Sequence, residues 1–134
     1  MDLRGKVAVF LINDPDFEAV PGDDALGLFG GKAATYCMRW TYKYEEAARR
    51  GAIAALIVHE TGPAAYGWKT AIAANGEGYD VVRSDPARDK VLLQSWIHRD
   101  AAVGIFRDAG LDFEALKKTA RSNAFRPIEL PGAT

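Results

Sequence analysis

The sequence contains only one cysteine, Cys37, so the chain cannot form an internal disulfide. A lone cysteine is compatible with an oxidising and with a reducing compartment. Cys37 lies in a stretch rich in aromatic residues, and this setting predicts a buried, structural thiol rather than a nucleophile.

Long apolar runs and an excess of positive charge are also missing. No apolar run approaches the about 18 residues that a membrane-spanning helix needs, so the sequence predicts no membrane partner. The 17 lysines and arginines are balanced by 18 aspartates and glutamates, which leaves a formal net charge of -1. This balance gives no electrostatic reason to expect a nucleic acid as partner.

The common motifs of catalytic and metal sites are missing as well. His59 is followed by Glu60, but no second histidine completes the His-Glu-x-x-His pattern of a zinc site. Residues 27–32 combine glycines with a lysine, but they lack the spacing and the Ser or Thr of a phosphate-binding loop. No serine lies in the glycine pattern of a nucleophile elbow. We therefore predict no catalytic, cofactor-binding or metal-binding residue in this chain.

What is present is the pattern of one α/β domain that spans residues 1–134. Residues 7–12 and 52–58 form continuous apolar runs, as in strands that are buried on both faces. Residues 33–50, between them, have helical spacing. A strand, a helix and a strand in this order predict a right-handed unit with two parallel strands.

The predicted helix places three aromatic residues, Tyr36, Trp40 and Tyr44, on one face, where they are expected to belong to the core. Gly51 is expected to end this helix in the left-handed conformation. The remaining elements are expected to be an edge strand, a sheet strand, two helices and a terminal strand at residues 79–82, 91–97, 100–109, 113–122 and 127–130. Residues 17–32 are predicted to form a long, ordered loop.

Polar residues follow the predicted strands, where the sites of parallel sheets often lie. His59 and His98 each end a strand, but neither has a neighbour at ligand spacing, which favours surface or hydrogen-bonded histidines. Asp14 and Asp16 follow the first strand. Acidic loops can bind calcium, but without the rest of an EF-hand pattern a solvated turn is favoured.

Several segments resemble the protease-associated (PA) domain. Its signature is a strand opened by glycine and lysine, a helix with lysine and alanine, and a strand opened by glycine and alanine. The residues that match are Gly5-Lys6-Val7, Lys43, Ala47, Gly51-Ala52 and Leu56-Ile57-Val58. Residues 28–61 are similar to the version carried by bacterial M28-family zinc aminopeptidases. The resemblance extends over nearly the whole chain, but outside this segment it rests mainly on the order of the elements.

The resemblance implies a β/β/α arrangement, in which a small sheet and a barrel-like strand layer are flanked by helices. It also implies a non-catalytic module from a longer, secreted or periplasmic peptidase, which shapes substrate access or contacts proteins and peptides. The resemblance is to the non-catalytic module, so it implies that zinc belongs to the adjacent peptidase domain.

Under this hypothesis, residues 13–31 and 62–78 form loops that border the neighbouring catalytic cleft. The candidate contacts with substrate or partner are Asp14, Asp16, Phe17, Phe29, Tyr66 and Trp68. Tyr66 and Trp68 either form a contact surface or pack against the domain's own loops. Two alternatives stay open: a stand-alone small-molecule-binding or hydrolytic α/β domain that uses His59 or His98, and a receptor-type luminal module that binds protein ligands.

Overall fold

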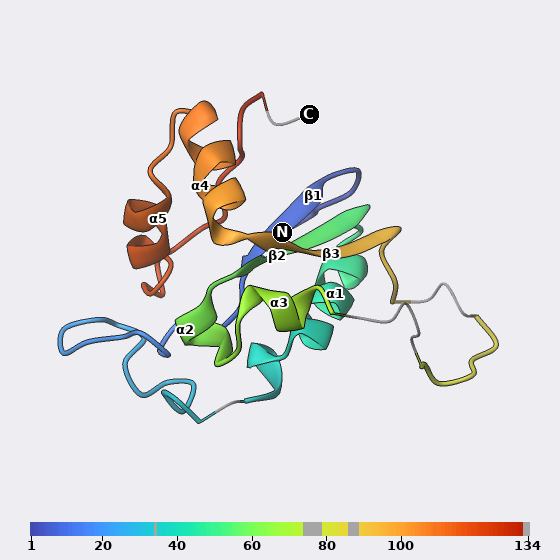
Figure 1. Cartoon of the computed structure of the whole chain (residues 1–134), viewed down its shortest axis with the longest axis horizontal. Helices are drawn as coiled ribbons and strands as arrows, with labels where there is room; N and C mark the ends of the chain where they lie inside the picture. The colour runs from blue at the N-terminus through green and yellow to red at the C-terminus, as the bar shows by residue number, and fades with distance from the viewer. Residues whose placement is uncertain (34, 74–78, 86–88, 133–134) are drawn as a thin grey trace.

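The centre of the molecule is a three-stranded parallel sheet with strand order β1-β2-β3 (Figure 1). The computed structural model describes residues 1–33, 35–73, 79–85 and 89–132. The elements in chain order are β1 (Val7–Leu11), the 3₁₀ helix η1 (Tyr36–Met38), α1 (Trp40–Arg49), β2 (Ala54–His59), α2 (Thr61–Ala64), α3 (Trp68–Ala71), β3 (Leu93–His98), α4 (Arg99–Asp108) and α5 (Phe113–Thr119). The predicted α/β class, with a parallel strand-helix-strand core, is confirmed.

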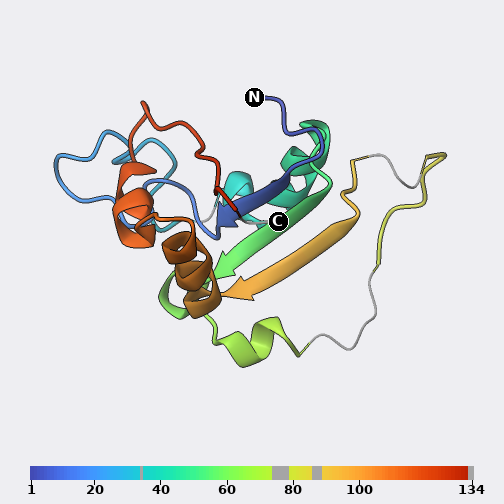
Figure 2. The ribbon, with the colours of Figure 1, turned by 90° about the horizontal axis from the view of Figure 1, so that it is seen from above.

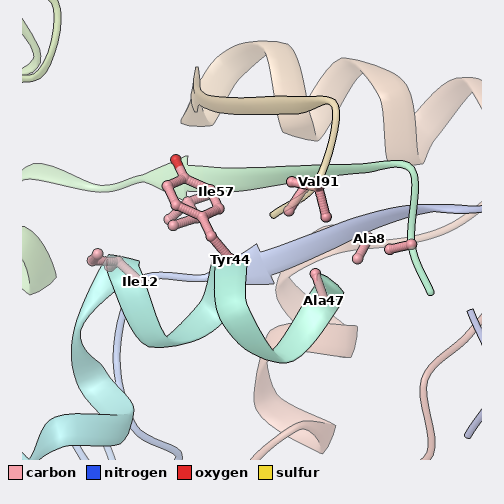
Figure 3. Close-up of a cluster of buried hydrophobic side chains, with 8 residues drawn as sticks. Ala8, Ile12, Tyr44, Ala47, Ile57 and Val91 are labelled. Atoms are coloured by element: carbon pink, nitrogen blue, oxygen red, sulfur yellow. The ribbon is translucent and has the colours of Figure 1, made fainter. Parts of the chain in front are cut away.

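Helices cover both faces of the sheet. On one face, Tyr44 and Ala47 of α1 pack with Ala8 of β1 and Ile57 of β2 (Figure 3). On the other face, Val58 of β2 forms a second cluster with one side chain from α4 and one from α5. The middle strand, β2, is thus buried on both sides, which explains why its sequence is a continuous apolar run.

The helix on the first face is shorter than its sequence pattern predicts. It begins at Trp40 instead of residue 33, because Arg39 is extended (φ −62°, ψ 138°) and separates the helix from η1. This break turns Tyr36 away from the core: its side chain is 56% exposed, whereas Tyr44 is 4% exposed. Trp40 and Cys37 are exposed too, so the predictions of a three-residue aromatic core face and of a buried thiol are wrong.

The C-terminal end of α1 agrees with the sequence. Gly51 has a φ of 83°, in the left-handed region that favours glycine. Its N–H donates to the carbonyl of Ala48, and the N–H of Ala52 donates to the carbonyl of Ala47. This pair of hydrogen bonds is the Schellman motif, which turns the chain from the helix directly into β2.

In the second half of the chain, β3, α4 and α5 lie within a few residues of their predicted positions. The strands predicted at residues 79–82 and 127–130 are wrong, because neither segment pairs with a neighbouring strand. Figure 2 shows the C-terminal tail passing beside β1, where Glu129 pairs with Lys6 at 3.3 Å. The segment after β2, predicted as a loop over residues 62–78, contains the short helices α2 and α3. Among the described residues, no helix is long and apolar enough to cross a membrane.

Candidate functional site

The carboxyl ends of the three parallel strands lie at one edge of the sheet (Figure 2). We call this the carboxyl edge. Two segments connect there: the long loop that follows β1, described over residues 12–33 and at Thr35, and residues 60–72, which follow β2 and contain α2 and α3. Parallel α/β sheets often bind their ligands at this edge. The polar residues of this edge are therefore described one by one.

The side chain of His59 fastens the segment 60–72 to the sheet. It is only 2% exposed, and its Nε2 lies 3.1 Å from the backbone oxygen of Tyr66. Because a carbonyl oxygen only accepts hydrogen bonds, this bond requires the proton on Nε2. The ring is also in contact with the rings of Tyr66, Trp68 and Trp96, at centroid distances of 5.5, 5.5 and 5.9 Å. His59 is thus a hydrogen-bonded core histidine.

His98 is the register partner of His59 on the neighbouring strand, so the fold brings the two imidazoles to the same face of the sheet. Its Nδ1 accepts a hydrogen bond from the N–H of Asp100 at 3.2 Å and so caps the first turn of α4. Its ring meets that of Trp68 edge-on at 5.3 Å. His98 is half-exposed and hydrogen-bonded, which agrees with the prediction of a surface or hydrogen-bonded histidine.

Asp14 and Asp16 are buried in the loop that follows β1. Oδ2 of Asp14 accepts a hydrogen bond from the hydroxyl of Thr35 at 2.6 Å. Oδ2 of Asp16 accepts from the backbone N–H groups of Phe29 and Gly31 at 2.9 and 2.8 Å. The prediction of a solvated turn is therefore wrong: both carboxylates are directed inward and hold the loop closed. Their burial also withdraws them from direct contact with a partner.

Lys43 of α1 is buried next to this loop. Its Nζ donates to the backbone oxygens of Cys37 and Met38 at 2.9 and 3.4 Å, and so ties η1 to α1. Burial lowers the pKa of the Lys43 amine, while the negative charge of Asp14 opposes this shift. The lysine of the PA-like pattern thus has a structural role in this fold.

A second lysine, Lys117 of α5, lies between the two segments of the carboxyl edge. Its Nζ is 2.8 Å from Oε2 of Glu18, in the long loop, and 2.8 Å from Oε2 of Glu60, which directly precedes α2. The side chains of Lys117 and Glu60 are only 11% and 10% exposed. Burial lowers the pKa of Lys117, but the hydrogen bonds to both glutamates outweigh it, so that the pKa is raised.

Two arginines extend this group of charges. Arg99 of α4 contacts Glu60 at 3.4 Å and also pairs with Glu114 of α5. Arg121 lies 3.5 Å from a carboxylate oxygen of Glu18. None of these pairs was predicted from the sequence. The acid and base of the pair Glu60–Lys117 are 57 positions apart, so no local spacing pattern indicates their contact.

The four aromatic candidates are partly buried, and they divide between the two segments. Phe17 and Phe29 belong to the long loop, and Tyr66 and Trp68 to the segment after β2. Tyr66 and Trp68 pack on the sheet through His59, so the structure favours packing against the domain's own elements for these two side chains. Residues 74–78, the end of the second predicted contact loop, lie outside the described residues.

Two buried oxygens, Oδ1 of Asn13 and Oδ1 of Asp16, have no hydrogen-bond partner among the described residues. Throughout residues 1–33, 35–73, 79–85 and 89–132, no group of three or more His, Cys, Asp or Glu side chains could hold a metal ion.

Comparisons with protein-family models, curated proteins and solved structures give no match to this chain.

Proposed function

We propose that this chain is a non-catalytic, PA-like module of an M28-type zinc aminopeptidase. It acts by shaping access to the adjacent peptidase domain or by contacting a protein or peptide. In this proposal the two segments at the carboxyl edge border the neighbouring cleft, and zinc belongs to the peptidase domain. The parent enzyme is secreted or periplasmic, and the sheet described above is part of a PA-type β/β/α arrangement.

The observation that carries the proposal is the use of the polar residues at the carboxyl edge. At the ends of parallel strands an enzyme often places reactive side chains. Here the polar side chains at these positions bind backbone groups of the chain itself. The Nε2 of His59 is bound to the backbone of Tyr66, the Nδ1 of His98 caps α4, and Asp16 binds backbone amides of its own loop. These contacts organise loops, which is what a module acting through its surface requires. The parallel strand-helix-strand core and the resemblance of residues 28–61 support the same proposal.

The alternative, a small-molecule-binding or hydrolytic domain that uses His59 or His98, has weaker support. His59 is enclosed by aromatic rings, and its contact with Tyr66 occupies Nε2. His98 is the more accessible of the two, since its side chain is half-exposed beside Trp68. A hydrolytic role would thus rest on His98, which makes His98→Ala the informative variant.

The first experiment reads the gene on both sides of the codons for residues 1–134. The proposal expects one reading frame that encodes the zinc ligands of an M28 peptidase outside residues 1–134. They include a histidine followed two residues later by an aspartate, a spacing that His98 and Asp100 already have within the chain, so only a further copy counts. In parallel, the purified chain is assayed with zinc and a series of aminoacyl p-nitroanilides. We expect no p-nitroaniline release above the protein-free rate. A reading frame without those ligands, or turnover that His98→Ala abolishes, contradicts the proposal.

The second experiment tests access in the full-length protein. Phe29→Ala, at the carboxyl edge, is expected to raise KM for long peptides more than KM for a single-residue anilide. Tyr79→Ala is the matched control, because Tyr79 is an exposed aromatic residue outside the two segments of this edge. If Phe29→Ala changes both substrates equally, or if Tyr79→Ala has the same effect, the carboxyl edge does not shape access.

A further inference from the structure

Lys117 occupies an unusual position for a lysine of a short surface helix. Its ammonium group is nearly buried and lies between two carboxylates, one from each segment of the carboxyl edge. A buried ammonium ion is costly unless opposite charges surround it closely. Here the compensation is divided between Glu18 and Glu60, so neither carboxylate alone supplies the whole of it.

The two carboxylates that contact Lys117 belong to different segments of the chain. Glu18 belongs to the long loop, which also contacts the region of α5 through Asp23–Arg121 and Asp24–Ser122. Glu60 directly precedes α2, and its backbone oxygen accepts the hydrogen bond from the N–H of Ala64. Lys117 therefore contacts both the long loop, through Glu18, and the N-terminal end of α2, through Glu60.

We propose that Lys117 couples the long loop to the segment 60–72, so that the two move as one unit. The cause is the shared compensation: when one carboxylate is lost, Lys117 is less stable in its buried position and its bond to the other carboxylate weakens. Lys117 is thus a positioning residue of the carboxyl edge. The coupling is a property of this chain alone, and only its consequence for a partner rests on the proposed function.

Amide hydrogen exchange of the isolated chain, measured by mass spectrometry, tests the coupling. Lys117→Met is expected to speed exchange in residues 17–28 and in residues 61–72, by about fivefold in each, while β2 stays unchanged. Lys118→Met is the matched control, since Lys118 is the next residue of α5, is exposed and makes no ion pair among the described residues.

A second pair of variants separates coupling from two independent bridges. Glu18→Gln is expected to speed exchange in residues 61–72, although Glu18 belongs to the other segment. Asp24→Asn, in the same loop, removes a carboxylate that bonds Ser122 rather than Lys117, and it is expected to leave residues 61–72 unchanged. Lys117→Arg keeps the charge and is expected to leave exchange in both segments at the wild-type rate. If Lys117→Met does not fold, Glu18→Gln together with Lys117→Arg tests the coupling.

The inference is overturned if Glu18→Gln affects only its own loop, or if Lys118→Met or Asp24→Asn loosens residues 61–72 as strongly. It is also overturned if Lys117→Arg loosens both segments, because the charge would then not be the cause. None of these measurements involves a peptidase, so a failure here is distinguishable from a failure of the proposed function.

Discussion

The buried imidazole of His59 donates a hydrogen bond through Nε2 to the backbone oxygen of Tyr66 at 3.1 Å. Tyr66 lies between the short helices α2 and α3, neither of which is long enough to be stable by itself. This hydrogen bond, together with the ring contacts of His59, therefore connects the segment 60–72 to the sheet.

His59→Leu keeps a side chain of similar size but removes the donor, which leaves a backbone acceptor without its partner. We expect the free energy of unfolding to fall by about 1–3 kcal/mol, measured by urea denaturation followed by tryptophan fluorescence. Lys69→Ala, at an exposed position of α3, serves as control and is expected to stay within about 0.5 kcal/mol of the wild type. An equal loss of stability in both variants would mean that the His59–Tyr66 bond has no special role.

Substitution by alanine is expected to have opposite effects on stability at Gly51 and at Gly104. Gly51 has a φ of 83°, and a Cβ there would lie 2.7 Å from Cγ of Arg4. Gly51→Ala is therefore expected to destabilise the chain by about 1–2 kcal/mol. Gly104 lies inside α4 with nothing within 4 Å of an added Cβ, so Gly104→Ala is expected to stabilise it by about 0.5–1 kcal/mol. Thermal unfolding by circular dichroism measures both, and effects of the same sign would contradict this reasoning.

The strand-helix-strand core could be predicted from the sequence because its signals are local. The apolar run of β2 and the glycine after α1 each determine the conformation of their own residues. The early start predicted for the helix failed for a related reason. The spacing of Tyr36, Trp40 and Tyr44 is helical, but the extended backbone of Arg39 interrupts the helix, and side-chain periodicity carries no information about such a break.

The candidate site could be predicted only in part, because its contacts join residues that are distant in the sequence. Asp16 accepts hydrogen bonds from amides that lie 13 and 15 positions away, which depends on how the whole loop folds back. The local sequence, an acidic residue beside a proline, therefore predicts a solvated turn and does not indicate these distant hydrogen bonds. The position of Lys117 depends in the same way on α5 packing beside the end of β2.

Lys43 provides a test of the contact between α1 and η1. Lys43→Met removes the donor to the backbone oxygens of Cys37 and Met38 and leaves the buried charge of Asp14 with less compensation. We expect a loss of about 3 kcal/mol in stability and faster reaction of the Cys37 thiol with Ellman's reagent, because η1 is released. Lys32→Met, at an exposed position, is the control. Unchanged thiol reactivity in Lys43→Met would show that Lys43 does not hold η1.

The burial of Tyr44 leads to a prediction for the pH dependence of stability in the alkaline range. Burial, with a smaller effect of Tyr66, raises the pKa of the Tyr44 phenol from 10.0 to about 12. The unfolded chain therefore loses this proton at a lower pH than the folded chain, so the contribution to stability is complete below pH 10 and is lost as the pH rises toward 12. Tyr44→Phe removes the titrating group and keeps the ring in the core (Figure 3).

We therefore expect the wild type to lose up to about 2 kcal/mol more stability than Tyr44→Phe between about pH 9 and about pH 11.5. Groups other than Tyr44 are common to both proteins, so their contributions cancel in the difference. Urea denaturation at each pH measures this quantity. Parallel pH profiles for the two proteins would show that the Tyr44 phenol ionises as readily in the folded chain as in the unfolded one, and hence that its burial next to Ile57 does not exclude water from the hydroxyl group.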